Sequence, residues 1–419
     1  MTKTINPFPQ QAKLAPLTWY SRYARTKEDG TLQSYSERYS EVLDCISKMG
    51  KFTHYENELC KWALNNLLAT PSGRITWVGG TDWFEKPDNF VGAFNCFSEH
   101  LVDIKGFLRN FNLLMCGCGA GQVLEEKYTS KIEKVVRSIP IPFIIGQPGD
   151  IKKEERKEES YLENENTLVI GDSRQGWVQA LEYILKSATD LNAPIITHVS
   201  LSNVRGFGER LKGFGGVSNP IGLKRLFTRV PEILNGVYNN NGGNFTPKDC
   251  CYILDETGLC VVAGNIRRSA GMKQFSYNHP QLKKNLYDPV SWQIPDDKKQ
   301  LRMSNHTNVF HKLPTYEQIL NSVRSQWETG EGAIQNARES VARCNADILK
   351  GHAKLTFLCL YENLEQARQY LADRYELVYG TPITLEELNH RMRRYGLNPC
   401  FPAGTMVLTR QGHYPIESL

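Results

Sequence analysis

The middle of the chain alternates short apolar segments with longer amphipathic ones, and this alternation is the strongest constraint on its fold. Thr167 to Ile170 is a short apolar run that leads through Gly171-Asp172-Ser173 into a helical pattern from near Gly176. Ile195 to Leu201 is a second apolar run, and Thr246-Pro247-Lys248-Asp249 places proline at a first helical position. Strands that alternate with helices pair mainly in parallel, so the sequence predicts an α/β fold.

Capping boxes predict helices on both sides of this core, because the paired side chains satisfy N–H groups that a helix start leaves unbonded. They occur at Ser34-x-x-Glu37, Thr53-x-x-Glu56, Thr315-x-x-Gln318 and Thr384-x-x-Glu387. We therefore expect a helical region over 1–70, α/β structure over 71–345 and an inserted helical hairpin over 346–397. The tail over 398–419 is expected to form a separate segment.

Composition narrows the class of protein. The 419 residues are 40% hydrophobic and 23% charged, which suits two to three domains or one large α/β barrel. The chain has no long apolar run and no apolar signal-peptide core at its start, so we expect no membrane span and a cytoplasmic location. The formal charge of +5 is not gathered into a basic tract. Composition therefore indicates no nucleic-acid partner.

The cysteines and histidines give no clear metal site. Cys116-Gly-Cys118 is conceivable as a metal or redox pair, but zinc needs two further ligands at compatible spacing, so a structural role is favoured. Cys250-Cys251 is predicted to lie in the core, and the nine histidines are scattered. We predict no metal site. The charge run from Lys152 to Glu159 is predicted to be a solvated helix or loop.

Two kinds of loop are candidates for phosphate binding. Arg205-Gly206-Phe207-Gly208 and Gly213-Phe214-Gly215-Gly216 combine glycine with nearby arginine, although such loops more often only turn the chain. Val261 to Ser269 ends in Arg267-Arg268 after Gly264-Asn265, and guanidinium groups suit phosphates. An equally good interpretation is that the two arginines form surface salt bridges.

Taken in order, these segments resemble the adenosylcobalamin-dependent (class II) ribonucleotide reductases, especially the ribonucleoside-triphosphate reductases. The resemblance covers roughly residues 20 to 345 plus Asn398-Pro399-Cys400. The matching stretches are Thr70 to Arg74 with Trp77-x-Gly79-Gly80-Thr81, Asn95-Cys96, Gly117 to Gly121, Gly171 to Trp177, His198 to Gly216, Val261 to Ala270, Ser304-Asn305 and the final tripeptide.

The resemblance implies part of a ten-stranded α/β barrel around a finger loop that carries a radical cysteine. In such enzymes adenosylcobalamin generates a thiyl radical that removes the 3′ hydrogen of the ribose, and two further cysteines reduce the 2′ carbon. The implied partners are a ribonucleoside triphosphate, a deoxynucleotide effector and a thioredoxin-type reductant. Carried over by motif, the implied site residues are Cys96 as the first reducing cysteine, Asn398 as the substrate-holding Asn, Ser72 and Asn95 as substrate-binding residues, and Asp172, Arg205, Arg267 and Arg268 around the allosteric site.

The pattern departs from this family immediately after Pro399. The family expects Cys-Gly-Glu, whereas the chain continues as Cys400-Phe401-Pro402-Ala403-Gly404-Thr405, which resembles the start of an intein. On this reading Cys400 is the splicing nucleophile and occupies the position that the radical cysteine takes only after splicing. Thr405 to Leu408 would then be the first strand of a splicing domain. We expect the isolated chain to lack reductase activity and to need a C-terminal fragment, joined by splicing in trans.

Two alternatives remain open at this point. One is the iron-dependent class I ribonucleoside-diphosphate reductase large subunit, although Gly264-Asn265-Ile266-Arg267-Arg268-Ser269 fits class II better. The other is a non-catalytic fragment that binds nucleotides. Cobalamin-dependent radical formation by the completed protein would distinguish a class II reductase from the first alternative. Deoxynucleotide binding without reduction would favour the second alternative.

Overall fold

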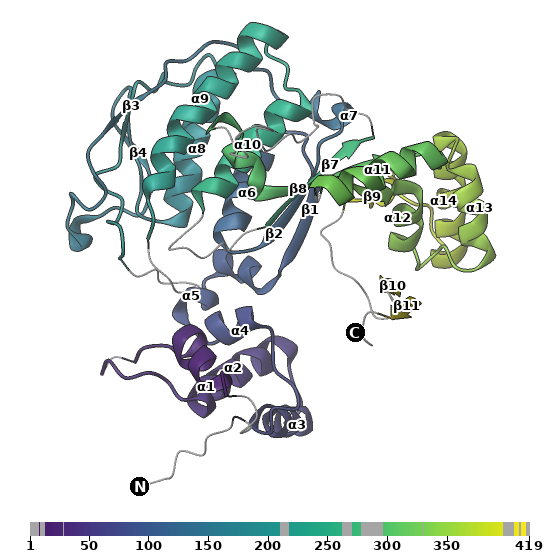
Figure 1. Ribbon diagram of the computed structural model, residues 1–419, viewed down its shortest axis with the longest axis horizontal. Coiled ribbons are helices and arrows are strands. Elements are labelled where there is room, and N and C mark those ends of the chain that lie inside the picture. Colours follow the sequence, from purple (N-terminus) through teal and green to yellow (C-terminus); the bar gives the residue numbers. More distant parts are fainter. Residues whose placement is uncertain are drawn as a thin grey trace.

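A five-stranded parallel sheet forms the centre of the molecule (Figure 1). The computed structural model describes residues 8, 13–27, 29–209, 218–261, 270–277, 296–329, 331–396, 406–409 and 412–415. The strand order is β1-β2-β7-β8-β9, and every neighbouring pair is parallel. The strands are β1 (Cys96–His100), β2 (Gly119–Val123), β7 (Ala270–Ser276), β8 (Ser304–Phe310) and β9 (Ala333–Asn336). The prediction of an α/β fold with parallel pairing is confirmed, and the ten-stranded barrel stays a prediction.

A layer of helices packs on one face of this sheet and holds the largest apolar core. The helices are α6 (Lys105–Met115), α8 (Arg174–Thr189), α9 (Ile221–Asn241) and α10 (Pro247–Cys260). Helix α6 contacts β2, and α10 contacts β7, α6 and α9. Phe107, Phe111, Leu181 and Phe227 are fully buried in this core. Burial of large apolar side chains between helices and sheet is the main stabilising term for such a layer.

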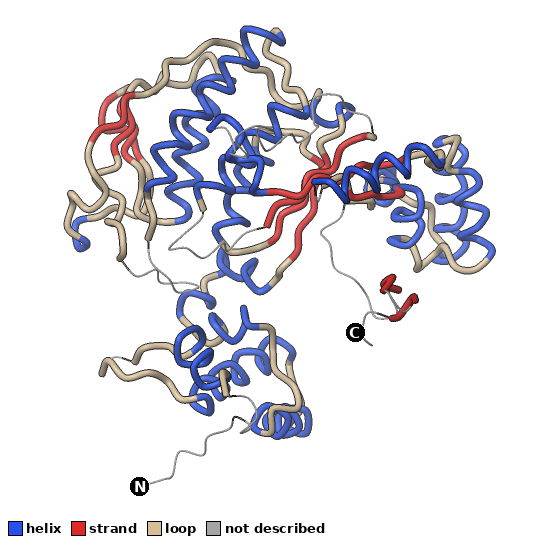
Figure 2. The backbone as a smooth tube through the Cα atoms, in the orientation of Figure 1, coloured by secondary structure: helices blue, strands red, loops and turns tan. Residues whose placement is uncertain are grey.

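A smaller sheet lies beyond these helices, at the left of Figures 1 and 2. Its order is β3-β6-β5-β4, with β3 (Phe143–Ile145), β6 (His198–Ser200), β5 (Thr167–Val169) and β4 (Tyr161–Asn164). Only the β4–β5 pair is antiparallel. Both apolar runs that the sequence assigns to strands are strands here. The short η3 (Lys153–Glu155) precedes β4.

The N-terminal helices form their own unit at the bottom of Figure 1. The capping boxes at Ser34 and Thr53 are both present. Arg38 is completely buried and joins two of these helices, because its Nε donates to the Thr76 carbonyl at 2.7 Å and its Nη2 to the Gly79 carbonyl at 2.5 Å. The elements are α1 (Ala15–Thr18), η1 (Trp19–Tyr23), α2 (Tyr35–Gly50), α3 (His54–Asn65), α4 (Gly73–Val78), α5 (Asp82–Glu85) and η2 (Pro87–Ala93).

The C-terminal helices gather on the opposite side of the sheet from the small sheet (Figure 1). They are α11 (Tyr316–Thr329), α12 (Ala337–Cys344), α13 (His352–Leu360), α14 (Leu364–Tyr379) and α15 (Leu385–Met392). The predicted hairpin over 346–397 is wrong in its helix count, because this range holds three helices. Asn363 caps α14, Gly380 ends it at a φ of 71°, and Thr384 caps α15.

The remaining described elements are short. They are α7 (Glu126–Thr129), η5 (Asp296–Met303), β10 (Met406–Thr409) and β11 (Gly412–Pro415). Strands β10 and β11 pair antiparallel with each other. The prediction of a strand after Thr405 is confirmed for β10.

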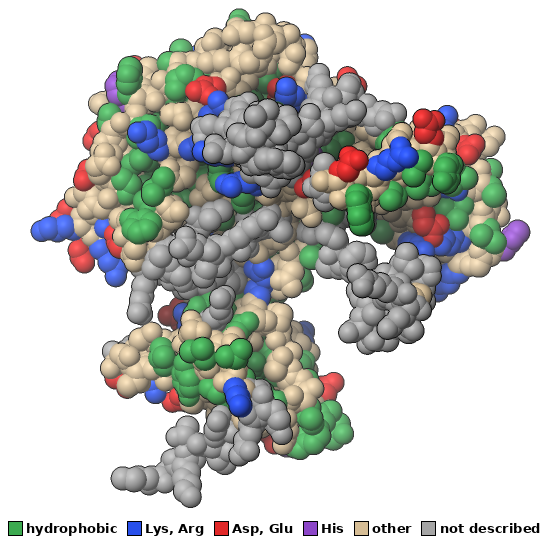
Figure 3. Space-filling view, viewed as in Figure 1, with side chains coloured by type: hydrophobic (Ala, Val, Ile, Leu, Met, Phe, Trp, Pro, Cys, Tyr) green, Lys and Arg blue, Asp and Glu red, His purple; other side chains and the backbone are tan. Residues whose placement is uncertain are grey.

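The described surface carries mixed charge. On the face shown in Figure 3, basic and acidic side chains are interspersed and apolar side chains lie among them. None of the described helices combines the length and the apolar character that crossing a bilayer requires.

Candidate active site

Strand β1 presents Cys96 on an open face of the central sheet. Side chains alternate along a strand, so Cys96, Ser98 and His100 point to the same face. The parallel register sets Cys96 beside Gly119 and Ser98 beside Gly121. Because those glycines carry no side chains, β2 presents only backbone next to Cys96 and Ser98. Cys96 and Ser98 are both exposed.

The chain that leads into β1 is fixed by one arginine. Arg74 Nε donates to Asn95 Oδ1 at 2.5 Å, and its Nη1 donates to the Cys116 carbonyl at 2.6 Å. The Asn95 carbonyl accepts from Gly119 N at 2.7 Å. Ser72 caps α4 just before Arg74, with its Oγ accepting from Ile75 N at 3.3 Å. Ser72 and Asn95 therefore help to shape the entry to β1, and their contact with a substrate stays a prediction.

The Cys116 and Cys118 thiols are buried on this same edge of the sheet. Burial raises the pKa of Cys118 to about 12, against the opposing charge of Arg74. Burial also raises the pKa of Cys116. The Cys118 sulfur lies 3.3 Å from the Phe94 carbonyl oxygen. A neutral, buried thiol is a poor nucleophile, so this geometry favours the predicted structural role.

Tyr395 and Gly396, far away in sequence, lie on the same face as Cys96. The Tyr395 ring meets the His100 ring edge-on at 5.2 Å between centroids. A Cβ atom on Gly396 would overlap Ser98 Oγ, so only glycine fits there without a shift of Ser98. The segment thus passes from His100 toward Ser98, along β1 in the direction of Cys96.

Tyr395 is anchored at both ends. Its hydroxyl donates to Glu125 Oε2 at 2.5 Å and lies 2.8 Å from the Tyr128 hydroxyl. Its carbonyl accepts from Gln274 Nε2 at 3.2 Å and from Gln335 Nε2. Tyr395 is 2% exposed, so water does not compete for these bonds. The contacts tie the chain before residue 398 to β2, β7 and β9.

Glu125 is the centre of this anchor and lies two residues after the end of β2. His311 Nε2 lies 2.6 Å from its Oε1, and Ser276 Oγ donates to the same oxygen at 2.7 Å. Lys127 Nζ lies 3.2 Å from Oε2. Burial favours the protonated acid, but the His311 contact, the Lys127 charge and the Tyr395 hydrogen bond outweigh it and hold the Glu125 pKa at about 2.

Sequence reasoning did not select this anchor. Its members come from the carboxyl ends of three parallel strands and from a residue far along the chain. One signal was available: Glu125 follows the glycine-dense segment that forms β2, and polar residues at the carboxyl end of parallel strands often gather at one edge. Burial lowers the pKa of the neighbouring His100 to about 4 and, with the charge of Glu125, raises the pKa of Tyr395.

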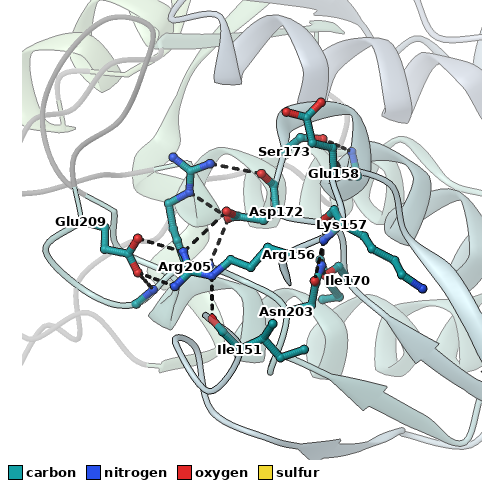
Figure 4. Close-up of polar contacts among 12 residues, drawn as sticks. Ile151, Arg156, Lys157, Glu158, Ile170, Asp172, Ser173, Asn203, Arg205 and Glu209 are labelled. Atoms are coloured by element: carbon teal, nitrogen blue, oxygen red, sulfur yellow. Dashed lines mark hydrogen bonds and ion pairs between the residues drawn. The ribbon is translucent and has the colours of Figure 1, made fainter. Parts of the chain in front are cut away.

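Two residues that the resemblance assigns to the allosteric site, Asp172 and Arg205, meet beside the small sheet (Figure 4). Asp172 Oδ1 accepts from the Arg205 backbone N at 3.0 Å and from its Nε at 2.8 Å. Arg205 Nη2 also donates to the Asp172 carbonyl at 3.1 Å. The structure therefore brings these two residues together, and their allosteric role stays a prediction. The Arg205 guanidinium therefore hydrogen-bonds to Asp172. These bonds support a role for Arg205 in shaping the loop on which it lies.

Arg156 and Glu209 complete this cluster (Figure 4). Arg156 donates to both Glu209 oxygens, at 2.8 and 2.9 Å, and lies 3.7 Å from Asp172 Oδ2. Glu209 Oε1 also accepts from Gly206 N at 2.6 Å. The Arg156 side chain is only 7% exposed, so the prediction of a solvated charge run is wrong at this position. The available signal was a single arginine in a run otherwise made of lysine and glutamate, because arginine suits buried bidentate pairs.

Some predicted site residues lie outside the described part of the chain. They are Arg267, Arg268, Asn398, Cys400 and the glycine loop Gly213-Phe214-Gly215-Gly216. Their predicted roles stay predictions.

Comparison with known proteins supports the resemblance that the motifs indicate. The chain is 27% identical over 308 residues to the adenosylcobalamin-dependent ribonucleoside-triphosphate reductase of Lactobacillus leichmannii, which covers 62% of this chain and 41% of that protein. It is 27% identical over 376 residues to the enzyme of the same name from Lactobacillus helveticus, covering 77% and 48%. A putative enzyme of this type from Mycobacterium phage D29 is 26% identical over 277 residues, covering 61% and 39%.

A solved structure supports the fold. The crystal structure of a B12-dependent (class II) ribonucleotide reductase superposes with a TM-score of 0.59 at 20% sequence identity, over 87% of this chain and 59% of that one. No family model matches the chain. The chain spans less than half the length of the curated relatives it matches. The predicted similarity to class II ribonucleotide reductases is confirmed.

Proposed function

We propose that this chain is a portion of an adenosylcobalamin-dependent ribonucleoside-triphosphate reductase and that Cys96 is one of its two reducing thiols. One observation carries the proposal: the Tyr395–Gly396 segment lies on the Cys96 face of β1. Two residues of chain reach about 7 Å, and two residues of strand span about 6.6 Å. From its contact beside Ser98, the chain can therefore bring Asn398 opposite Cys96.

The chemistry of the proposed site follows from its groups. Two cysteine thiols supply two electrons and two protons, and they become a disulfide while the ribose 2′ hydroxyl leaves as water. The product is a 2′-deoxynucleotide. Cys96 is suited to this exchange because its side chain is exposed on an open sheet face, beside the bare backbone of Gly119. In the proposal Asn398 holds the ribose hydroxyls, and Ser72 and Asn95 border the substrate.

The cofactor proposed for the complete protein is adenosylcobalamin, which the names of the relatives specify. When bound, it supplies the radical. Two cavities among the described residues have volumes of about 480 and 490 Å³; one is lined by residues of α9, α10 and η5, and the other by the N-terminal helices. Neither borders Cys96, so no corrin contact is assigned.

We further propose that a deoxynucleotide effector acts through the loop that Asp172 and Arg205 hold. The bonds between these two residues and the Arg156–Glu209 pair fix residues 205–209. Phe207 on this loop is 70% exposed. A thioredoxin-type protein would restore the thiols. Cys400 would act as a splicing nucleophile toward a C-terminal fragment, and the cytoplasm is the proposed location.

The test joins this chain to a complementary C-terminal reductase portion that supplies Cys-Gly-Glu and the remaining barrel. The joined protein is assayed with a ribonucleoside triphosphate, adenosylcobalamin and a dithiol. Deoxynucleotide should form, and Cys96→Ser should reduce turnover with dithiol to background. Cys344→Ser is the matched control, because Cys344 is exposed on α12 and should leave turnover unchanged. Full turnover by the Cys96→Ser protein would overturn the proposal.

A further inference from the structure

The helix-covered face of the central sheet buries a polar cluster that the proposed reduction does not use. Cys251 and Asp255 lie one turn apart on α10, so their side chains share a helix face. His306 on β8 points toward them from the sheet. The three residues are 0%, 1% and 7% exposed. The sequence spacing did not reveal this group, because its histidine comes from a strand 51 residues after Asp255.

The distances within the cluster suit a tetrahedral metal ion. The Cys251 sulfur lies 3.5 Å from Asp255 Oδ2 and 3.7 Å from His306 Nε2. One ligand atom from each residue lies within 4.8 Å of the other two. With a Zn–S bond of about 2.3 Å and Zn–N or Zn–O bonds of about 2.0 Å, a tetrahedral ion keeps sulfur about 3.5 Å from the other ligand atoms. The observed distances from the Cys251 sulfur to Asp255 Oδ2 and to His306 Nε2 are close to this expected value.

The identity of the ligand atoms selects the class of metal. One thiolate, one imidazole and one carboxylate form a mixed soft and borderline set, which suits Zn²⁺ and disfavours Mg²⁺ or Ca²⁺, since those prefer all-oxygen sites. Thiolate and carboxylate together would neutralise the dication. A three-residue zinc site leaves its fourth position to a small ligand such as water.

Neighbouring polar groups hold the proposed ligands in place. Ser304 Oγ donates to Asp255 Oδ2 at 3.0 Å, and the His306 ring packs edge-on against Phe275 at 5.2 Å. Lys273 Nζ lies 3.8 Å from Asp255 Oδ1 and donates to Gln122 Oε1 at 2.6 Å. Outer contacts of this kind orient metal ligands.

From this geometry we infer that Cys251, Asp255 and His306 form a Zn²⁺ site between α10 and β8. The rival account is a metal-free cluster in which the Cys251 thiol hydrogen-bonds to Asp255 and the Lys273 ammonium balances the carboxylate. The two accounts differ in whether the sulfur carries a proton or a metal ion. The zinc site is independent of the proposed reductase function.

The experiment uses the full chain, purified after zinc supplementation and dialysed against metal-free buffer. Metal analysis should find about one zinc ion per chain, and replacement by Co²⁺ should give a thiolate-to-cobalt charge-transfer band. Cys251→Ser and His306→Gln should each lose the ion and the band. Cys250→Ser is the matched control, because Cys250 is an equally buried neighbour outside the cluster. It should keep both.

A second measurement tests the zinc site even if the variants of Cys251 and His306 fail to fold. X-ray absorption of the zinc-loaded wild-type chain should then show one sulfur and otherwise nitrogen or oxygen in the first shell. Zinc no higher than the buffer level in the wild-type chain would overturn the inference. A first shell of several sulfurs would also overturn it, as would retention of the metal by a folded Cys251→Ser chain.

Discussion

Replacing Tyr395 by phenylalanine tests the anchor that holds the chain against β1. The change removes the hydroxyl that donates to Glu125 Oε2 at 2.5 Å and lies 2.8 Å from the Tyr128 hydroxyl. The ring and its packing against His100 are retained. Glu125 keeps its contacts with His311, Ser276 and Lys127, so its charge is not left without partners.

The magnitude follows from the kind of hydrogen bond that is lost. A hydrogen bond to a charged group contributes about 1.5 to 3 kcal/mol, and we expect Tyr395→Phe to cost about 2 kcal/mol. Because the chain contains several structural units, a local measurement is preferable to global unfolding. In hydrogen exchange, amides of α15 and residues 393–396 should exchange about 30-fold faster, since 1.4 kcal/mol is a factor of about ten.

Tyr361→Phe is the matched control for this experiment. Tyr361 is buried in the same apolar cluster at 3% exposure, and among the described residues its hydroxyl makes no hydrogen bond. Loss of the Tyr361 hydroxyl should change the hydrogen-exchange rates of the same amides by less than about threefold. Equal effects of the two substitutions would refute the role given to the Glu125–Tyr395 bond.

Three further predictions concern reactivity, acid stability and the second cluster. Iodoacetamide should label exposed Cys96 well before Cys118, whose pKa burial raises to about 12; peptide mapping that finds equal rates would contradict the described exposure. Burial lowers the His100 pKa from 6.5 to about 4, so between these pH values the unfolded chain is protonated at His100 and the folded chain is not. The free energy of unfolding should therefore fall by about 3 kcal/mol as the pH decreases from 6.5 to about 4. His100→Gln should flatten that part of a pH series of denaturation curves, and an unchanged slope would argue against it. Asp172→Asn removes the charge that Arg205 contacts and should speed hydrogen exchange in residues 203–209 about tenfold, whereas unchanged exchange would count against this contact.

Local sequence signals predicted the elements of the fold well. Proline at the first helical position after Thr246 marks the start of α10, and the capping box at Ser34 marks the start of α2. The signals act within a few residues, so they do not depend on the tertiary structure. The helix count over 346–397 failed because helix ends at Asn363 and Gly380 are weak signals inside a polar, helix-forming stretch.

The sites were less accessible to sequence reasoning, for a physical reason. Motif resemblance selected Cys96 and assigned Asp172 and Arg205 to the same allosteric site; the structure brings the last two together, and the roles of all three stay predictions. The Glu125–Tyr395 contact joins residues 270 positions apart, and the Cys251–His306 contact joins residues 55 positions apart. Such contacts arise from the register and crossover of parallel strands, which a single sequence does not specify.

The most direct test of the account is the proximity of residue 398 to Cys96. In the full chain with Cys400→Ala, an added Asn398→Cys substitution places a thiol at the predicted position. Mild oxidation should then form a disulfide that peptide mapping assigns to residues 96 and 398 and that Cys96→Ser abolishes. If the thiol at 398 stays reduced, or pairs with another cysteine while Cys96 remains alkylatable, the shared site does not exist.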